Sequence, residues 1–369
     1  MIIGFDARLA NECKRAGVGN YCAELLRALP EAAPDLKLRL YLDAPPRAGF
    51  PLNAAAADIR VLPRRRWWTQ RTLRRELRKD TPHAFFSPIT RLPLQCPCPA
   101  AAVVHDLAFL SHPSSFTWSR LIRARLQAAH VVRAADVLVA DSESTRREIE
   151  RHYGATPGRV ITAPLGCDAQ FLHPPGPGLV AMVRHELKLS NQYLLYVGRI
   201  QPRKNLERLI AAFSQFRARH ANSTCELVIA GDAGWLDASI RRAAAQSPVR
   251  DAIRFLGYVP ASNLPALLTG AQALALVSLW EGFGLPALEA MACGTPVIAS
   301  NTSSLPEVVG GAGELVDPSD TDAIAKGLER VLLDDEHRAT LSRMGRARAV
   351  GFTWAATASK VAEALRSIA

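Results

Sequence analysis

Charged side chains and glycines in a pattern that could bind a phosphate-bearing ligand gather in the second half of the chain. The stretch SLWEGFGLPALEAMACGTPVIAS, residues 278–300, carries Glu281 and Glu289, which are eight positions apart. The glycines of this stretch precede a predicted helix that has Pro286 at its first position. The backbone N–H groups at the start of a helix can bind phosphate. The two carboxylates can therefore address different parts of one phosphate-bearing ligand, and shared acid–base work is the alternative.

Three cations precede this stretch in the chain. Arg199, Arg203 and Lys204 follow the apolar run QYLLYVG and come before a helix-forming sequence. A diphosphate carries about two unit charges, which arginine and lysine at the end of a buried strand can neutralise. Solvated surface arginines are the alternative, but the position at a strand end favours a phosphate site.

The first half of the chain adds two candidate positions. His105 and Asp106 end the buried strand AAVVHD, and ligands bind at such strand ends in open α/β sheets. A histidine with its hydrogen bonds satisfied in the core is the alternative. Gly17 and Gly19 begin the first helix and can offer N–H groups to an anion, although a plain tight turn explains them equally well.

Strands and helices alternate along the chain, and the pattern restarts after a proline-rich segment near residues 168–180. This alternation predicts an α/β protein with two Rossmann-like domains facing across a deep cleft in which a ligand binds. We place the first domain at residues 1–170 and the second at 171–353. The proline-rich segment is expected to be a linker.

Composition is typical of a globular protein: 49% of the 369 residues are hydrophobic and 21% are charged. No apolar run is long enough to span a membrane, and residues 1–9 do not resemble a signal peptide, so we expect a cytoplasmic protein. The seven cysteines lack C-x-x-C spacing and are expected to be reduced, with a metal site at Cys96 and Cys98 disfavoured. Asp320 and Asp322 form a D-x-D sequence, which we interpret as a helix start instead of a metal site.

The net charge of +11 is concentrated in the first 168 residues, which carry +9 of it. Arg64, Arg65 and Arg66 precede Trp67 and Trp68, and a helix rich in arginine, TQRTLRRELRK, follows. Such a segment is typical of contact with an anionic membrane or with nucleic acid. A solvated helix whose tryptophans pack inward is the alternative.

Several motifs in the right order resemble one family, the retaining glycosyltransferases of family 4, also called glycosyl transferases group 1. They include YVGRIQPRKNLERLIAAF, LVIAGD, IRFLGYV, WEGFGLPALEAMACGTPVIAS and LPEVVGGAGELVDP, with looser matches at AGVGNY and VVHDLAF. The resemblance implies the GT-B fold, a nucleotide-sugar donor bound by the second domain, an acceptor bound by the first, and no metal. It also implies that a last helix, about 354–369, packs back on the first domain.

The same resemblance assigns a role to each candidate residue. Arg199 and Lys204 would hold the diphosphate, and Gly17 would add a backbone N–H. Glu289 would bind the ribose, Glu281 would face the sugar and His105 would contact it near the reacting carbon. The remaining positions would be Phe283, Gly284 and Leu285 at sugar and phosphate, and Tyr258 and Val259 against the base.

We therefore expect a metal-independent, retaining transferase that moves a hexose, with mannose favoured, in cell-surface polysaccharide or lipopolysaccharide synthesis. The donor would be GDP-mannose or a UDP-hexose, and the acceptor a glycan or a lipid-diphosphate-linked sugar. Peripheral contact with an anionic membrane is expected, and contact with nucleic acid is not. The alternatives are a basic protein on a Rossmann-like scaffold that binds nucleic acid or a membrane surface, and a nucleotide-sugar epimerase of the GT-B fold.

Overall fold

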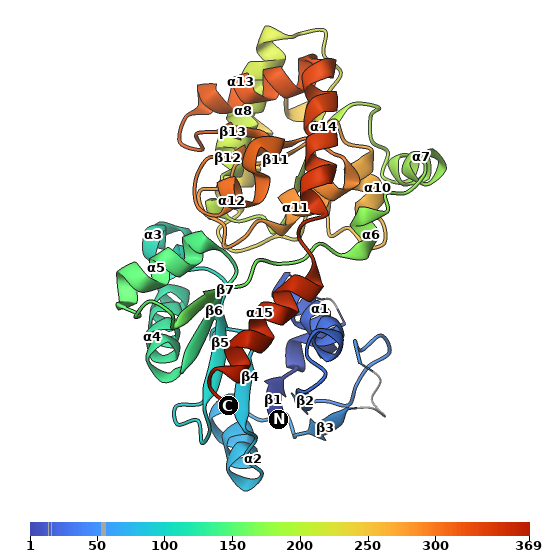
Figure 1. Cartoon of the computed structure of the whole chain (residues 1–369). Helices are drawn as coiled ribbons and strands as arrows, with labels where there is room; N and C mark the ends of the chain where they lie inside the picture. Colours follow the sequence, from blue (N-terminus) through green and yellow to red (C-terminus); the bar gives the residue numbers. More distant parts are fainter. Residues whose placement is uncertain (14, 16, 53–56) are drawn as a thin grey trace. The chain divides into compact units, whose positions relative to one another are not determined.

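The computed structural model describes residues 1–13, 15, 17–52 and 57–369, which form two compact units (Figure 1). Unit 1 contains Met1–Leu107, Ser119–Gly166 and Thr353–Ala369, and unit 2 contains Ala108–Trp118 and Cys167–Phe352. The chain thus changes units after Leu107 and again after Trp118, passes to unit 2 between Gly166 and Cys167, and returns to unit 1 for its last helix.

Unit 1 is built on a parallel seven-stranded sheet with the order β3-β2-β1-β4-β5-β6-β7. Apolar runs buried on both faces explain why these segments form central strands; β5, for example, is AAAVV and every residue in it is buried. The strands are β1 (Ile2–Asp6), β2 (Lys37–Leu42), β3 (Asp58–Val61), β4 (Ala84–Ser87), β5 (Ala100–Val104), β6 (Val137–Ala140) and β7 (Val160–Thr162).

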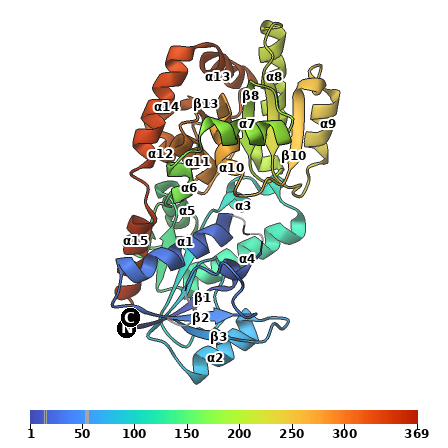
Figure 2. The ribbon, with the colours of Figure 1, turned by 90° about the vertical axis from the view of Figure 1, so that its right-hand side faces the viewer.

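Helices cover both faces of the unit 1 sheet. They are α1 (Gly17–Ala32), α2 (Arg74–Lys79), α4 (Trp118–Ala134), α5 (Glu143–Tyr153) and α15 (Trp354–Arg366), with a 3-10 turn η1 (Arg8–Asn11) and a π-helical turn η2 (Thr69–Leu73). Right-handed crossovers put α1 on one face and α2 and α4 on the other, because the connections run in opposite directions along the sheet. Figure 2 shows α4 and α15 on opposite sides of this sheet.

The last helix is an integral part of unit 1. Helix α15 packs on α1, and the Thr357 hydroxyl donates to the Pro164 carbonyl at 2.6 Å. Gly166 permits this close approach, since a Cβ there would lie 2.3 Å from the backbone nitrogen of Trp354. A side chain at position 166 would therefore push the start of α15 away.

Unit 2 has a parallel six-stranded sheet with the order β10-β9-β8-β11-β12-β13. The strands are β8 (Tyr193–Val197), β9 (Glu226–Ala230), β10 (Ile253–Gly257), β11 (Ala273–Leu276), β12 (Val297–Ser300) and β13 (Glu314–Val316). The strand order reverses between β8 and β11, which makes the carboxyl ends of these two strands the switch point where ligands bind in such sheets.

The helices of unit 2 include α8, which follows β8, and α11, which follows β11. The α-helices are α3 (Ala108–Ser111), α6 (Ala169–Leu172), α7 (Pro177–Glu186), α8 (Leu206–Arg219), α9 (Ala238–Gln246), α10 (Leu264–Thr269), α11 (Leu285–Cys293), α12 (Leu305–Val309), α13 (Thr321–Leu333) and α14 (Asp335–Ala349). Short 3-10 turns are η3 (Pro113–Ser115), η4 (Pro202–Lys204), η5 (Arg250–Ala252) and η6 (Gly310–Ala312).

The segment 168–180, expected to be a linker, is instead partly helical. It contains α6 and the start of α7. Pro177 is the first residue of α7, where the missing N–H costs nothing and the fixed φ suits a helix. Proline density therefore marked a helix start here and not only a chain connection.

Across the described residues, no helix is long and apolar enough to cross a membrane. All seven cysteines are free thiols, as expected. The expected helix start at the D-x-D sequence is confirmed, because the Asp320 side chain accepts from the backbone N–H groups of Asp322 and Ala323 at the beginning of α13.

Candidate functional site

Two of the predicted site residues of the second half, Lys204 and Glu281, meet at the switch point of unit 2. The turn after β8 carries Arg199 and Lys204, and the turn after β11 carries Glu281. The backbone joins the two turns directly, since Leu279 N–H donates to the Arg203 carbonyl at 2.9 Å. Residues that are 77 positions apart in the sequence, Lys204 and Glu281, are thereby brought into contact.

Glu281 is the centre of a buried polar cluster. Its Oε1 accepts from Lys204 Nζ at 2.5 Å and from the Ser278 hydroxyl at 2.7 Å, and its Oε2 accepts from Arg203 Nη1 at 3.3 Å. Lys204 and Glu281 are only 8% and 6% exposed. Burial raises the pKa of the Glu281 carboxyl, but Lys204 and Arg203 outweigh it and the pKa lies below its usual value.

The charge of this cluster favours an anionic ligand. Two cations, Arg203 and Lys204, face one carboxylate, so the cluster keeps a net positive charge at neutral pH. Arg203 also donates to the Trp280 carbonyl at 2.7 Å, which fixes its guanidinium against the turn after β11. A positive charge held in this way needs no reorganisation when a phosphate binds.

Asn205 connects the turn after β8 to the end of β11 by a hydrogen bond. It adopts the left-handed conformation, with φ at 60°, immediately before α8. Its side-chain amide donates to the carbonyls of Val277 and Pro318 at 2.9 and 2.8 Å, and the residue is buried. These two hydrogen bonds fix Asn205, and therefore also the position of Lys204, the residue before it.

The loop WEGFG and helix α11 have the predicted form. Gly284 precedes the helix with φ at 106°, and a Cβ there would lie 2.6 Å from Leu305 Cδ2, so this position requires glycine. Ser304 is fully buried and its hydroxyl bonds to the carbonyls of Glu281 and Phe283 at 3.0 and 2.8 Å. Leu285 starts the helix and Gly294 ends it.

Glu289 lies on α11 and is half-buried. Burial, together with repulsion from Asp168, raises the pKa of its carboxyl to about 7. Asp168 is fixed as the N-cap of α6, where it accepts from Gln170 N–H at 3.2 Å. Near neutral pH, the Glu289 carboxyl is therefore protonated in part of the molecules, and it can donate to a ligand hydroxyl in one state and accept from it in the other.

Three other predicted contact residues are accessible in unit 2. Arg199 is exposed, and its carbonyl accepts from the Tyr196 hydroxyl at 3.2 Å. Tyr258 is 46% exposed directly after β10, and Val259 next to it is half-buried. Arg199 is thus separate from the Glu281 cluster in its side-chain contacts, although it belongs to the same turn as Lys204.

The predicted residues of the first half lie in unit 1. His105 follows β5, and its Nδ1 lies 2.7 Å from Asp141 Oδ2 while its Nε2 donates to the Pro88 carbonyl at 2.9 Å. Burial lowers the pKa of this histidine, but Asp141 outweighs it and the pKa is raised. A sugar hydroxyl can reach a ring nitrogen only by replacing one of these partners.

Gly17 is exposed at the first residue of α1, and no described atom outside its immediate neighbours lies within 4 Å of the position of an added Cβ. That leaves open space at the helix start, as an anion seat requires. Ala16, which belongs to the AGVGNY motif, lies outside the described residues.

Sequence reasoning missed the residues that position the site. Asp141 ends the strand DVLVADS, and that position at a strand end is a signal that could have identified it. Ser278, Ser304 and Asn205 carry no such signal, because serine and asparagine are common in turns. Their partners are known only from the folded chain.

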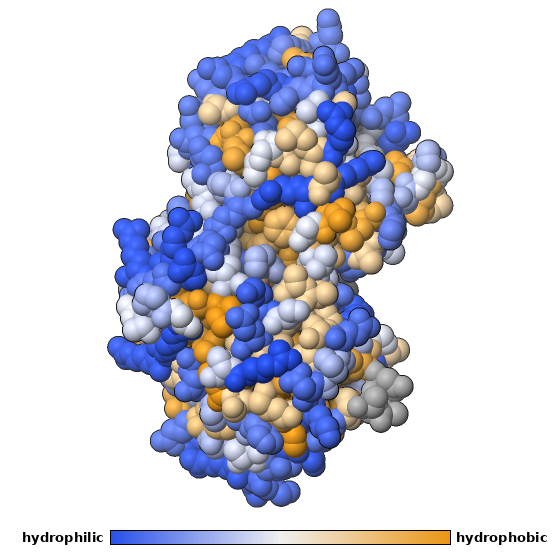
Figure 3. Space-filling model, viewed as in Figure 1, coloured by the Kyte–Doolittle hydropathy of each residue, from blue (hydrophilic) through white to orange (hydrophobic). Residues whose placement is uncertain are grey.

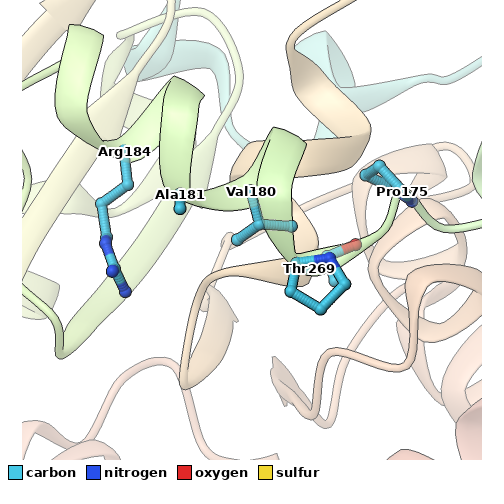
Figure 4. Close-up of a pocket in the computed structure, with 6 residues that line it drawn as sticks. Pro175, Val180, Ala181, Arg184 and Thr269 are labelled. Atoms are coloured by element: carbon cyan, nitrogen blue, oxygen red, sulfur yellow. The ribbon is translucent and has the colours of Figure 1, made fainter.

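A hollow lies elsewhere on unit 2, against helix α7. Figure 3 shows an apolar patch over this helix, where Leu179 and Met182 are 43% and 50% exposed. None of the predicted site residues borders the hollow, which Figure 4 shows with α7 on one side. Its lining residues are Pro175, Pro177, Val180, Ala181, Arg184 and Thr269.

Comparison with known proteins identifies the family of the chain. Residues 181–348 match the family described as glycosyl transferases group 1, and residues 15–171 match glycosyltransferase family 4. The chain is 31% identical over 362 residues to the O-antigen chain mannosyltransferase B of Escherichia coli, covering 92% of each chain.

Solved structures show the same fold. Sucrose-phosphate synthase from Thermosynechococcus elongatus has a TM-score of 0.78 at 21% identity, covering all of this chain and 98% of the other. Anabaena Alr3699/HepE, solved in complex with UDP-glucose, has a TM-score of 0.76 at 20% identity, covering 99% of each chain. The chain has the GT-B fold, belongs to family 4 of the glycosyltransferases, the glycosyl transferases group 1, and is a hexosyltransferase.

Proposed function

We propose that the protein transfers a hexose, with mannose favoured, from a nucleotide sugar to a glycan or lipid-diphosphate-linked acceptor in cell-surface polysaccharide synthesis. The mannosyltransferase relative from Escherichia coli supports mannose and an O-antigen type of product. The UDP-glucose complex of the Anabaena protein supports a nucleotide-sugar donor. GDP-mannose and UDP-hexoses remain the two donor classes to be compared.

The observation that carries this proposal is the net positive cluster of Arg203, Lys204 and Glu281 at the switch point. When a sugar–phosphate bond breaks, positive charge develops on the anomeric carbon and negative charge on the departing diphosphate. Cations fixed at the strand ends would stabilise the departing group. They would do so without a metal ion, which is why we propose a metal-independent reaction.

Retention of the anomeric configuration is also part of the proposal. A double displacement would need a carboxylate free to attack the sugar. Both oxygens of Glu281 already accept hydrogen bonds, and a pKa of about 7 gives Glu289 only partial charge at neutral pH. Neither glutamate is suited to nucleophilic attack, which supports a front-face reaction in which the leaving phosphate deprotonates the acceptor.

The test is a panel of nucleotide sugars incubated with the purified full-length chain. We expect one donor to be hydrolysed slowly and its nucleotide to raise the melting temperature; at a hundredfold excess over Kd, binding adds about 2.7 kcal/mol. If no donor is consumed and neither GDP nor UDP raises the melting temperature, the proposal is wrong. A donor whose sugar changes stereochemistry with no acceptor present would indicate an epimerase.

Metal independence has its own measurement. Transfer should proceed at an unchanged rate after exhaustive treatment with EDTA, and added Mg²⁺ or Mn²⁺ should not accelerate it. A rate that falls with EDTA and recovers with a divalent cation would contradict this part of the proposal while leaving the transferase assignment in place.

A further inference from the structure

Gln201 is a buried amide whose oxygen has no hydrogen-bond partner. The residue lies in the turn after β8, between Arg199 and Arg203, and is 4% exposed. Its Oε1 atom is shielded from solvent, and no described residue donates to it. Asn205, four positions later and equally buried, donates instead to two carbonyls. An unpaired buried polar atom costs free energy, so the Gln201 amide requires an explanation that the folded chain alone does not supply.

Two more polar atoms without partners lie in the neighbouring turns. Trp280 Nε1 follows β11 and Thr302 Oγ1 follows β12, and both are buried and unpaired in the described part of the chain. The strands β8, β11 and β12 are adjacent in the sheet, so their carboxyl ends share one edge. The turn after β11 donates to the Arg203 carbonyl at 2.9 Å, and Glu281 N–H donates to the Ser303 hydroxyl at 3.1 Å. The three unpaired atoms therefore belong to one hydrogen-bonded group of turns.

The types of these atoms restrict the group that can pair with them. An amide oxygen accepts hydrogen bonds, an indole N–H donates them, and a threonine hydroxyl does both. Ionised phosphate oxygens only accept, so a diphosphate cannot pair with Gln201 Oε1. A sugar hydroxyl donates and accepts, and a ligand with several hydroxyl groups can satisfy all three atoms.

We propose that Gln201, Trp280 and Thr302 bind hydroxyl groups of the nucleotide-sugar donor, beside the cations proposed to hold its diphosphate. This inference rests on the proposed donor and deepens it, because it names side chains that select the sugar. A site with buried polar atoms of this kind rejects an analogue that lacks the hydroxyl, since the atoms then stay unpaired. The hydroxyl groups can belong to the ribose or to the transferred hexose, and the experiment separates the two.

The test uses variants that remove the hydrogen-bonding group and keep the size of the side chain. Gln201→Met and Thr302→Val each delete one unpaired atom. Without ligand, each variant should melt about 2 °C above the wild type, because no buried polar atom is left unpaired at that position. Each should bind the donor on the order of tenfold more weakly in isothermal titration calorimetry.

Two probes identify which sugar is bound. The first is the nucleoside diphosphate, GDP or UDP, and the second is the matching nucleotide sugar, GDP-mannose or UDP-glucose. If the variants lose affinity for the nucleotide sugar alone, the hydroxyl groups belong to the hexose. If they lose affinity for both probes by the same factor, the hydroxyl groups belong to the ribose.

Gln215 supplies a matched control. Its Oε1 atom is also buried without a partner among the described residues, but it lies on α8, about 14 Å along the helix from its start. Gln215→Met should therefore melt higher than the wild type, as Gln201→Met does, and bind both probes with unchanged affinity. If Gln201→Met does not fold, Gln201→Ala replaces it, because alanine removes the amide without adding bulk.

Two outcomes would overturn the inference. Gln201→Met and Thr302→Val could melt higher and yet bind both probes as tightly as the wild type, which would make the unpaired atoms sites of internal water. Gln215→Met could also weaken binding as much as Gln201→Met, which would make the loss independent of the turns. A wild-type chain that binds neither probe contradicts the proposed donor itself, so the two failures are distinguishable.

Discussion

At the scale of single residues, the structure changes how Lys204 and Glu281 are to be understood. The family resemblance implied separate roles for them, diphosphate for Lys204 and sugar for Glu281. In the folded chain the two side chains are bonded to each other at 2.5 Å and both are buried. Lys204 therefore has a structural task as well as the proposed catalytic one.

Lys204→Met should consequently lose stability as well as activity. Removing one partner leaves the Glu281 carboxylate buried beside Arg203 alone, at a cost of about 3 kcal/mol. Transfer should fall by orders of magnitude because the positive charge at the proposed diphosphate site is reduced. Thermal melting and initial rates measure the two effects separately.

A second substitution separates the two effects. Adding Glu281→Gln to Lys204→Met removes the uncompensated charge, so the double variant should melt closer to the wild type yet remain inactive. Full activity in the double variant would show that Lys204 serves only to neutralise Glu281.

Glu289 predicts a pH dependence of stability. Its pKa is about 7 in the folded chain against an ordinary value of 4.5. Between these values the folded chain keeps a proton that the unfolded chain has released, so the free energy of unfolding falls as pH rises from about 4.5 to about 7. Glu289→Gln should remove this fall and be roughly 3 kcal/mol more stable at pH 8.

The partner of Glu289 supplies the control. Asp168→Asn removes the repulsion but keeps the burial, so the fall in stability should become smaller without disappearing. Denaturant unfolding at several pH values measures this for all three proteins. The assignment is contradicted if Glu289→Gln and the wild type show the same slope.

The sequence identified candidate site residues but not the residues that they contact. His105 was identified from its place at a strand end, whereas its partner Asp141 is 36 positions away. The repulsion between Asp168 and Glu289 likewise acts between α6 and α11, and nothing in the local sequence of either segment indicates it. Hydrogen-bond partners distant in sequence depend on how the elements pack, which periodicity does not specify.

At the scale of secondary structure, local sequence signals such as a glycine at a helix end correctly predicted where elements begin and end. The helix expected to end at Gly294 does so, and the strand expected after it is β12. The paired tryptophans show the limit: Trp68 is buried and stacks under Arg8 at 3.8 Å, while Trp67 is 59% exposed. Only one of the two packs inward, and the exposed one, Trp67, adopts a positive φ of 63°.

Substitutions of Asn205 test how the turn between β8 and α8 contributes to stability and activity. Asn205→Gly keeps the left-handed backbone accessible but removes the bonds to Val277 and Pro318, which should cost about 2 kcal/mol. Asn205→Ala should cost about 1 kcal/mol more, because alanine disfavours that conformation. Both variants should also lose activity, since Lys204 is no longer fixed.

Melting temperatures and kcat/KM for the two Asn205 variants give the comparison. Equal stability of the glycine variant and the wild type would mean that the two buried carbonyls find other donors. A fully active but destabilised variant would mean that the turn positions Lys204 without help from Asn205.

At the scale of the whole molecule, the two units are not two continuous halves of the chain. The alternation of strands and helices correctly predicted two α/β halves, and the parallel sheets of seven and six strands confirm this fold. Local patterns could not show that residues 108–118 group with unit 2. That grouping depends on contacts between segments far apart in the sequence.

The return of the last helix gives a prediction about unfolding. Helix α15 buries Ala358, Val361, Ala362, Ala364 and Leu365 completely. A chain ending at Phe352 keeps all of unit 2 but removes this packing from unit 1, at a cost on the order of 5 kcal/mol. Calorimetry of the shortened chain should therefore show the transition of unit 1 at a lower temperature than in the full chain. The transition of unit 2, which we expect the nucleotide of the proposed donor to raise, should be unchanged by the truncation.

Point substitutions on α15 make the same argument without shortening the chain. Val361→Asp, at a fully buried position, should lower only the transition of unit 1, while Lys360→Ala, at an exposed position of the same helix, should leave both transitions unchanged. If Val361→Asp lowers the nucleotide-responsive transition equally, the two units unfold together. In that case α15 would stabilise the whole chain cooperatively, and the contacts within unit 1 alone would not account for its effect.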